Sequence, residues 1–123
     1  MHVKSNPIFV ALDLPTPDQA LAIAQQVAPH VGGFKIGLEL FTAGGAAVVS
    51  AVQSLGADVF LDLKFHDIPN TVAKAVANAT RLNVQMMTIH CAGGPDMIRA
   101  AETSAQETAA AMNVDPPLIL GVT

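Results

Sequence analysis

The sequence predicts an α/β fold built on a parallel β-sheet. Short β-like segments recur at a steady interval along the 123 residues, and segments with helix start and stop signals lie between them. This alternation is typical of right-handed βαβ units. Most ionisable residues near these segments lie where a segment ends, which is the edge that carries active sites in parallel α/β proteins. The expected strands are residues 8–12, 34–38, 58–62, 86–90 and 118–122.

The helices between these strands are expected from their start and stop signals. Thr16-Pro17-Asp18-Gln19 offers an N-cap, a first-turn proline and a capping-box glutamine, and an apolar stripe follows. Gly56 stands where a helix end favours a left-handed residue, and Pro69 can open a helix because proline is tolerated in the first turn. The expected helices are residues 17–28, 46–55, 69–82 and 95–111.

Composition limits the possible functions. The hydrophobic content of 51% is enough for one core, and the net charge of -4 offers no basic face for nucleic acid or anionic membrane. The most apolar region, residues 31–52, contains Lys35 and Glu39, so no transmembrane helix is expected. Residues 1–7 lack the pattern of a signal peptide. The single cysteine, Cys91, fits a reducing cytoplasm and is expected to be a buried structural thiol.

The chemistry is expected in the segment 62–71, which follows an apolar run and contains Asp62, Lys64 and Asp67. Side chains alternate along a strand, so Asp62 and Lys64 should face one cavity, separated by about 6.6 Å along the backbone. Asp67 would lie in the loop before the next helix. The alternative interpretation is structural: a salt bridge at the end of the strand, with Asp67 as an ordinary helix N-cap.

Other polar residues are expected at the same edge of the sheet. Asp13, Lys35, His90 and Thr123 each lie on or directly after a β-like segment, and their shared placement favours a functional site. A metal site formed by His66 and His90 with Asp62 and Asp67 is disfavoured. The Lys64 ammonium would lie among these residues and compete with the ion. The Gly44-Gly45 and Gly93-Gly94 pairs lack phosphate-loop spacing and are expected to be tight turns.

With these residues in place, the chain resembles the orotidine 5'-phosphate decarboxylases. The resemblance rests on Val10-Ala11-Leu12-Asp13, Phe34-Lys35-Ile36-Gly37, His90, Gly121-Val122-Thr123 and the full segment Asp62-Leu63-Lys64-Phe65-His66-Asp67-Ile68-Pro69-Asn70-Thr71. It implies an eight-stranded (β/α)8 TIM barrel, a homodimer with active sites shared at the interface, no cofactor, and orotidine monophosphate as the substrate.

The resemblance also implies roles for single residues. Lys64 would be the proton donor, Asp62 its neighbour near the substrate carboxylate, and Asp67 the second acid, supplied by the partner subunit. Asp13 and Lys35 would bind the ribose region, Thr71 would join from the partner, and Thr123 would lie near the pyrimidine. The carbanion left by loss of carbon dioxide is poorly delocalised, so electrostatics fixed before the reaction must lower the barrier. An ammonium between two carboxylates stays charged and can then deliver the proton.

The chain ends at the fifth of eight strands, so residues 1–123 are expected to be the N-terminal part of one barrel domain, with about four βα units plus strand five. The resemblance implies that the phosphate-binding segments of the family would follow after Thr123. This chain alone is therefore expected to be inactive. Two alternatives stand beside this interpretation. One is a magnesium-dependent sugar-phosphate decarboxylase or aldolase of the same barrel group, disfavoured because strand two offers Lys35 instead of an acid. The other is an inactive half-barrel.

Overall fold

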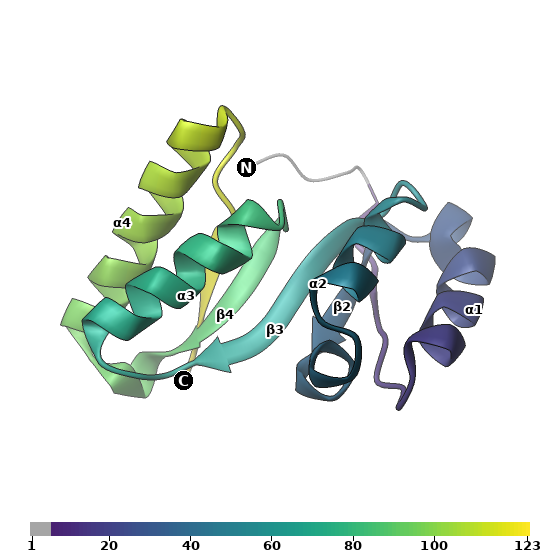
Figure 1. The fold of residues 1–123 in the computed structure, drawn as a ribbon, viewed down its shortest axis with the longest axis horizontal. Helices are drawn as coiled ribbons and strands as arrows, with labels where there is room; N and C mark the ends of the chain where they lie inside the picture. The colour runs from purple at the N-terminus through teal and green to yellow at the C-terminus, as the bar shows by residue number, and fades with distance from the viewer. Residues whose placement is uncertain (1–5) are drawn as a thin grey trace. The chain divides into compact units, whose positions relative to one another are not determined.

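In the computed structural model of the chain, residues 6–123 are described, and strands and helices alternate through them (Figure 1). Within these residues the strands are hydrogen-bonded in the order β1-β2-β3-β4-β5. The pairs β1–β2, β2–β3 and β4–β5 are parallel, which confirms the α/β class. The strands are β1 (Phe9–Ala11), β2 (Gly33–Gly37), β3 (Asp58–Phe65), β4 (Met86–His90) and β5 (Leu118–Val122). The helices are α1 (Pro17–Val27), α2 (Leu38–Gln53), α3 (Pro69–Arg81) and α4 (Pro95–Met112), with 3-10 turns at Ala28–His30 and Cys91–Gly93.

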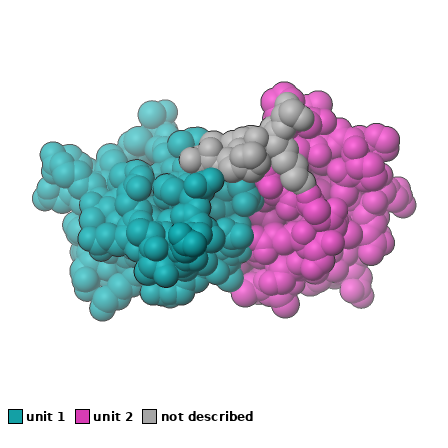
Figure 2. All heavy atoms as spheres, turned by 90° about the horizontal axis from the view of Figure 1, so that it is seen from above, with its two compact units in different colours: residues 1–2, 63–123 teal, residues 3–62 magenta. Residues whose placement is uncertain are grey.

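The described residues divide after Asp62 into two compact units, which Figure 2 colours separately. Unit 2, in magenta, contains β1, α1, β2, α2 and β3 up to Asp62. Unit 1, in teal, contains β3 from Leu63 onward, followed by α3, β4, α4 and β5. The boundary therefore falls inside the segment that carries the candidate chemistry, and each unit is described by itself.

Unit 2 is built around β2, which is buried at four of its five positions. This near-continuous burial is typical of a parallel strand covered on both faces. Each fully buried Leu, Ile, Val or Phe contributes about 1.5–3 kcal/mol relative to its exposed state. Thr16 caps α1 by accepting a 3.3 Å hydrogen bond from the Gln19 N–H, as the sequence predicts. The buried residues of this unit include Phe34, Ile36, Val49, Val52, Val59 and Leu61.

Unit 1 is built on the packing of α3 against α4, which lie side by side in Figure 1. The buried face of α4 is small, because Ala101, Ala105 and Ala109 follow Met97 at intervals of four residues. Residues four apart share one face of a helix, so this alanine stripe lets the neighbouring backbone approach closely. The helix ends at Asn113, whose φ of 57° is the left-handed conformation common at helix C-termini.

Some expected boundaries need correction. The first strand is Phe9–Ala11, shorter than residues 8–12, although the N–H of Leu12 still donates to the Lys35 carbonyl at 2.9 Å. The second strand begins at Gly33 and ends at Gly37, because α2 begins directly at Leu38. The third strand runs to Phe65 instead of ending at residue 62, so Lys64 lies inside it. The fourth and fifth strands lie where the sequence predicts them.

The second helix is the largest correction. The sequence predicts residues 46–55, whereas α2 spans Leu38–Gln53 with a kink at Gly45, where φ is 60° and ψ is -151°. The backbone at Gly45 is not helical, so the expected break at the glycine pair and a helix after it are present, and the helical residues 38–44 are the part that was not predicted. Gly56 follows with a φ of 81°, as the left-handed position predicts. In the described residues, no helix combines the length and apolar character needed to cross a membrane. The expectation about a signal peptide rests largely on residues 1–5, which lie outside the described residues.

Candidate functional site

In unit 2, three of the predicted site residues form one ion-pair cluster. The Lys35 Nζ atom lies 3.2 Å from Asp62 Oδ2 and 3.8 Å from Asp13 Oδ1. The Asp62 side chain is only 10% exposed, whereas that of Asp13 is 65% exposed. A buried carboxylate is costly unless a hydrogen-bonded cation accompanies it, so the Lys35 ammonium accounts for the presence of Asp62 in the core. The sequence placed these residues at one edge but did not pair Lys35 with Asp62.

The pairing follows from the register of the sheet. Gly37 in β2 is opposite Asp62 in β3, so Lys35 lies two residues before the position that faces Asp62. Residues two apart point to the same face of a strand and are separated by about 6.6 Å. The lysine side chain is long enough to span that distance along the strand. Register cannot be derived from the sequence of either strand alone, which is why this ion pair was missed.

Gly37 lies beside the cluster. A Cβ atom at this position would lie 3.7 Å from Asp13 Oδ1, 3.8 Å from Lys35 Nζ and 3.9 Å from the Asp62 carbonyl oxygen. These are ordinary contact distances, so the position would accept a methyl group, and the glycine leaves that volume empty next to three polar groups.

In unit 1, Lys64 has an unusual backbone conformation. Its φ is 51°, in the left-handed region, although it lies inside β3. A non-glycine residue in this region costs about 1–2 kcal/mol, and such strain persists only where the surroundings hold it in place. The strand-alternation argument assumed extended backbone at both Asp62 and Lys64, and Lys64 departs from that geometry, so the shared face of the two side chains stays a prediction.

Thr88 contacts the same residue and was not predicted from the sequence. The backbone N–H of Lys64 donates a 3.0 Å hydrogen bond to Thr88 Oγ1. Thr88 lies in β4 and is 5% exposed, which makes it one of the few buried polar residues of the described chain. Threonine is common in strands, so only its position two residues before His90 could have drawn attention to it.

Asp67 lies between β3 and α3, as predicted, and its side chain is exposed. The N-cap of α3 is Ile68 and not Asp67, so the ordinary N-cap interpretation is wrong in detail. Instead, Asp67 Oδ1 accepts a 2.7 Å hydrogen bond from the N–H of Ile68. A shallow hollow at this end of α3 is lined by His66, Asp67, Ile68, Pro69, Ala92 and Gly93.

His66 and His90 come together in unit 1, with their ring centroids 5.4 Å apart and the rings tilted by 51°. Gly93 lies close by: a Cβ there would clash with the Met97 side chain and would lie 3.4 Å from His66 Cδ2. Across residues 6–123, no group of three or more His, Cys, Asp or Glu side chains is arranged to hold a metal ion.

The remaining predicted residues are placed as follows. Asn70 and Thr71 lie in the first turn of α3 and are exposed, and Thr123 follows β5 and is also exposed. Leu63 and Phe65 flank Lys64 in β3 and are half-buried. Cys91 is a free thiol that is only half-buried, so the expectation of a buried thiol is wrong, because the residue begins the 3-10 turn after β4.

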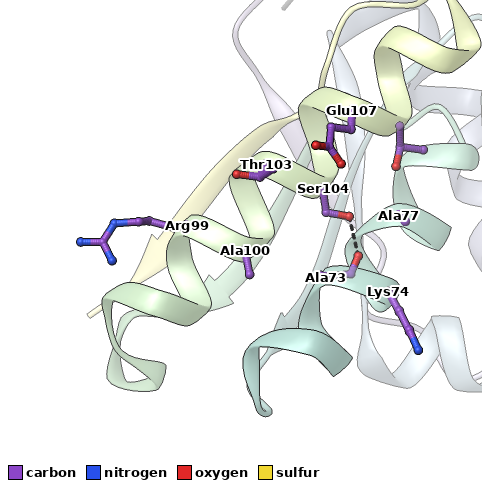
Figure 3. A pocket seen from close by; sticks show the side chains of 9 residues that line it. Ala73, Lys74, Ala77, Arg99, Ala100, Thr103, Ser104 and Glu107 are labelled. Carbon is purple, nitrogen blue, oxygen red and sulfur yellow. Dashed lines mark hydrogen bonds between the residues drawn. The ribbon is translucent and has the colours of Figure 1, made fainter.

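A second hollow in unit 1 lies between α3 and α4 (Figure 3). The hydroxyl of Ser104 donates to the Ala73 carbonyl across it, and the side chains of Lys74, Arg99 and Glu107 surround it. None of the predicted site residues lines this hollow. It belongs to the helix packing of the unit.

Comparison with known proteins shows the family of the chain. Residues 6–123 match the family described as "Orotidine 5'-phosphate decarboxylase / HUMPS family". Orotidine 5'-phosphate decarboxylase of Paramagnetospirillum magneticum is 48% identical over 118 residues, covering 96% of this chain and 50% of the relative. The enzyme of the same name from Moorella thermoacetica is 48% identical over 123 residues, covering 100% of this chain and 48% of the relative.

Solved structures give the same result. Orotidine 5'-phosphate decarboxylase from Lactobacillus acidophilus superposes with a TM-score of 0.86 at 36% identity, over 97% of this chain and 53% of that one. The enzyme from Methanocaldococcus jannaschii, in complex with the inhibitor BMP, has a TM-score of 0.80 at 26% identity, over 99% of this chain and 53% of that one. The chain therefore belongs to the orotidine 5'-phosphate decarboxylase / HUMPS family and has the fold of part of its TIM barrel. It spans about half the length of the curated relatives that it matches.

Proposed function

We propose that the protein decarboxylates orotidine 5'-monophosphate to uridine 5'-monophosphate in de novo pyrimidine biosynthesis. The observation that carries the proposal is the segment from Asp62 to Thr71 in a chain of this family: Asp62 and Lys64 lie in the last part of β3, and Asp67 lies between β3 and α3. The names of the relatives from P. magneticum and M. thermoacetica support it. So does the inhibitor-bound state of the M. jannaschii neighbour.

In this proposal Lys64 is the proton donor. Decarboxylation leaves a localised carbanion at C6 of the pyrimidine, so the largest catalytic effect comes from charges that are in place before the bond breaks. Asp62 and the Asp67 of the partner subunit would flank the Lys64 ammonium, whose positive charge stabilises the developing negative charge. Carbon dioxide departs, the electron pair of the broken carbon–carbon bond stays on C6, and the Lys64 ammonium transfers its proton to that carbon.

The ion-pair cluster of unit 2 is proposed to bind the ribose. Lys35 and Asp13 offer a donor and an acceptor to sugar hydroxyls, and Gly37 leaves space beside them. A partly exposed ion pair can exchange one of its contacts for a ligand hydroxyl at small cost. The other residues proposed to contact the nucleotide are Leu63, Phe65, His66, Ile68, Pro69, Asn70, Thr71, His90 and Thr123.

We further propose a homodimer in the cytoplasm, with no cofactor and with active sites shared between subunits. Ile68 is 65% exposed and lies between Asp67 and Pro69. A large apolar side chain this exposed next to site residues is the kind that a partner surface covers. Asp67, on the same exposed loop, would then act in the partner's site.

A magnesium-dependent reaction of the same barrel group is the second candidate. It is disfavoured by the position of Lys35, whose ammonium lies 3.2 Å from Asp62 and occupies the place where such a site needs a second acid.

The test requires a complete barrel. We define the completed barrel as this chain joined to the part of the M. thermoacetica relative that lies beyond the match. The 123-residue chain alone is expected to be inactive, because it lacks the later barrel strands and the phosphate-binding groups that would contribute binding energy to the reaction. Mass spectrometry confirms its length, and loss of orotidine monophosphate absorbance measures its activity. An inactive 123-residue chain beside an active completed barrel is the expected result.

In the completed barrel, Lys64→Ala should lower kcat by about 10³-fold or more, because it removes both a proton donor and a preorganised charge. Binding of uridine monophosphate should weaken less than tenfold, since the ammonium acts mainly on charge that develops during the reaction. Lys74→Ala is the matched control, because Lys74 is an exposed lysine of α3 outside the proposed site. Its kcat should equal that of the parent.

EDTA should leave the activity unchanged. Activity abolished by EDTA and restored by magnesium would replace the cofactor-free proposal with the magnesium-dependent one. A completed barrel that melts cooperatively but does not consume orotidine monophosphate would contradict the proposed function as a whole.

A further inference from the structure

We infer that Thr88 is a positioning residue that aims the Lys64 side chain by holding its backbone in the left-handed conformation. The inference rests on the proposed function, since it assigns Thr88 a part in that reaction. Its evidence is the 3.0 Å hydrogen bond from the Lys64 N–H to Thr88 Oγ1, the φ of 51° at Lys64, and the burial of Thr88.

The conformation of Lys64 requires an external cause. Among the described residues, three other than glycine have a positive φ: Lys64, Asn83 and Asn113. The two asparagines lie at the ends of helices, where a left-handed residue is common and asparagine tolerates it. Lys64 is the member of this group that lies inside a strand and has no intrinsic preference for the conformation. Its surroundings must therefore hold it.

The acceptor of the Lys64 N–H identifies which part of the surroundings holds the left-handed conformation. In a regular parallel pair, a strand N–H donates to a carbonyl of its neighbour. The Lys64 N–H instead donates to a side-chain hydroxyl on β4, which is itself fixed by its burial in that strand. A hydroxyl two bonds from the backbone reaches a position that the ladder carbonyls do not occupy. Thr88 therefore provides the acceptor that the rotated peptide needs.

This contact determines where the lysine points. The Cα–Cβ direction changes with φ, so a return of Lys64 to extended geometry would redirect the whole side chain. Catalytic groups must be held within about 0.5 Å of the productive geometry, and a displacement of about 1 Å can lower the rate about 10²-fold. Thr88 does not need to touch the substrate to affect catalysis, because it acts through Lys64.

The test compares three variants of the completed barrel. Thr88→Val keeps the branched shape and removes the hydroxyl, whereas Thr88→Ser keeps the hydroxyl. Thr80→Val is the matched control: Thr80 is 1% exposed, and its hydroxyl donates to the Val76 carbonyl inside α3 at 2.8 Å. Both valine variants lose one buried threonine hydroxyl, but only one of them loses the contact with Lys64.

Thr88→Val is expected to lower kcat about 10²-fold, with less than a threefold change in the Kd for uridine monophosphate. NMR should show at least tenfold faster amide exchange at Lys64, because its N–H loses the acceptor. Thr88→Ser should stay within threefold of the parent in kcat, and Thr80→Val should leave both kcat and the Lys64 amide unchanged. If Thr88 only stabilised the fold, serine would not restore kcat, and Thr88→Val would not lower kcat while leaving the Kd for uridine monophosphate nearly unchanged.

The inference is overturned if Thr88→Val keeps kcat within threefold of the parent, or if Thr80→Val lowers kcat equally. If Thr88→Val does not fold, Thr88→Ala takes its place under the same criteria, since it also lacks the acceptor. Failure of the proposed function would look different: the parent itself would not consume orotidine monophosphate. The Lys64 amide exchange would still decide whether Thr88 holds the backbone.

Discussion

At the scale of single residues, the two glycines of β2 differ in whether the fold leaves space for a side chain. A Cβ at Gly33 would lie 2.4 Å from the Asp58 carbonyl oxygen and 2.6 Å from Phe9 Cε2, whereas a Cβ at Gly37 meets nothing closer than 3.7 Å. Both residues belong to the same strand of unit 2. Gly33 is therefore required by packing, and Gly37 is not.

We predict that Gly33→Ala destabilises the completed barrel by about 2 kcal/mol or more, because the clash is with backbone that cannot move aside. Gly37→Ala should change stability by less than about 1 kcal/mol. It should instead weaken uridine monophosphate binding about tenfold, since one methyl group in a ligand space is worth about 1–3 kcal/mol. Urea unfolding and calorimetric titration measure the two effects. Unchanged binding in Gly37→Ala would mean that the space beside Lys35 is not used by the ligand.

The residues that sequence reasoning missed depend on contacts between strands. Asp62, Lys64 and Asp67 were found because ionisable groups are rare at the end of an apolar run. The Lys35–Asp62 pair depends on the β2–β3 register, and the Thr88–Lys64 hydrogen bond depends on a backbone rotation inside β3. Neither register nor a left-handed lysine leaves a local pattern in the sequence.

At the scale of elements, the helix punctuation was informative wherever a proline or a capping residue marked an end. Thr16 caps α1, and prolines begin α1, α3 and α4. At α2 the Gly44-Gly45 pair marked a real interruption of the helix, but the helical residues 38–44 before it were not predicted. In the structure the chain is helical on both sides of the pair, and Gly45 alone carries the kink.

We predict that Gly45→Ala destabilises the completed barrel by about 1–3 kcal/mol. A Cβ at Gly45 would meet no atom within 4 Å, so the cost comes only from the backbone, whose φ of 60° and ψ of -151° suit glycine almost exclusively. Ala47→Ser, at an exposed position of the same helix, is the control and should cost less than about 0.5 kcal/mol. Equal stability of Gly45→Ala and the parent in urea would show that the kink is not required.

At the scale of the whole molecule, the site residues predicted from the sequence fall in both units. Asp13, Lys35 and Asp62 belong to unit 2, while Lys64, Asp67 and His90 belong to unit 1. The chain also spans about half the length of its relatives. The proposed activity therefore requires the rest of a barrel and, in our proposal, a second subunit.

The ownership of Asp67 gives the sharpest test of the shared site. If each site combines Lys64 of one subunit with Asp67 of the other, two inactive variants of the completed barrel should restore activity together. Lys64→Ala and Asp67→Asn chains are mixed equally, unfolded and refolded together. About half of the dimers are then heterodimers when two-fold pairing is random. Each heterodimer has one intact site and one doubly damaged site, so about a quarter of all sites should be active.

Each variant refolded alone is the control and should stay inactive, while an Asp67→Asn sample mixed with parent chains calibrates the assay. Native mass spectrometry measures the heterodimer fraction, because the two substitutions change the subunit mass differently. Heterodimers without recovered turnover would assign Asp67 to the site of its own chain, since every site would then carry one damaged residue. Recovery near a quarter of the parent activity would instead require the exposed loop after β3 to reach into the partner.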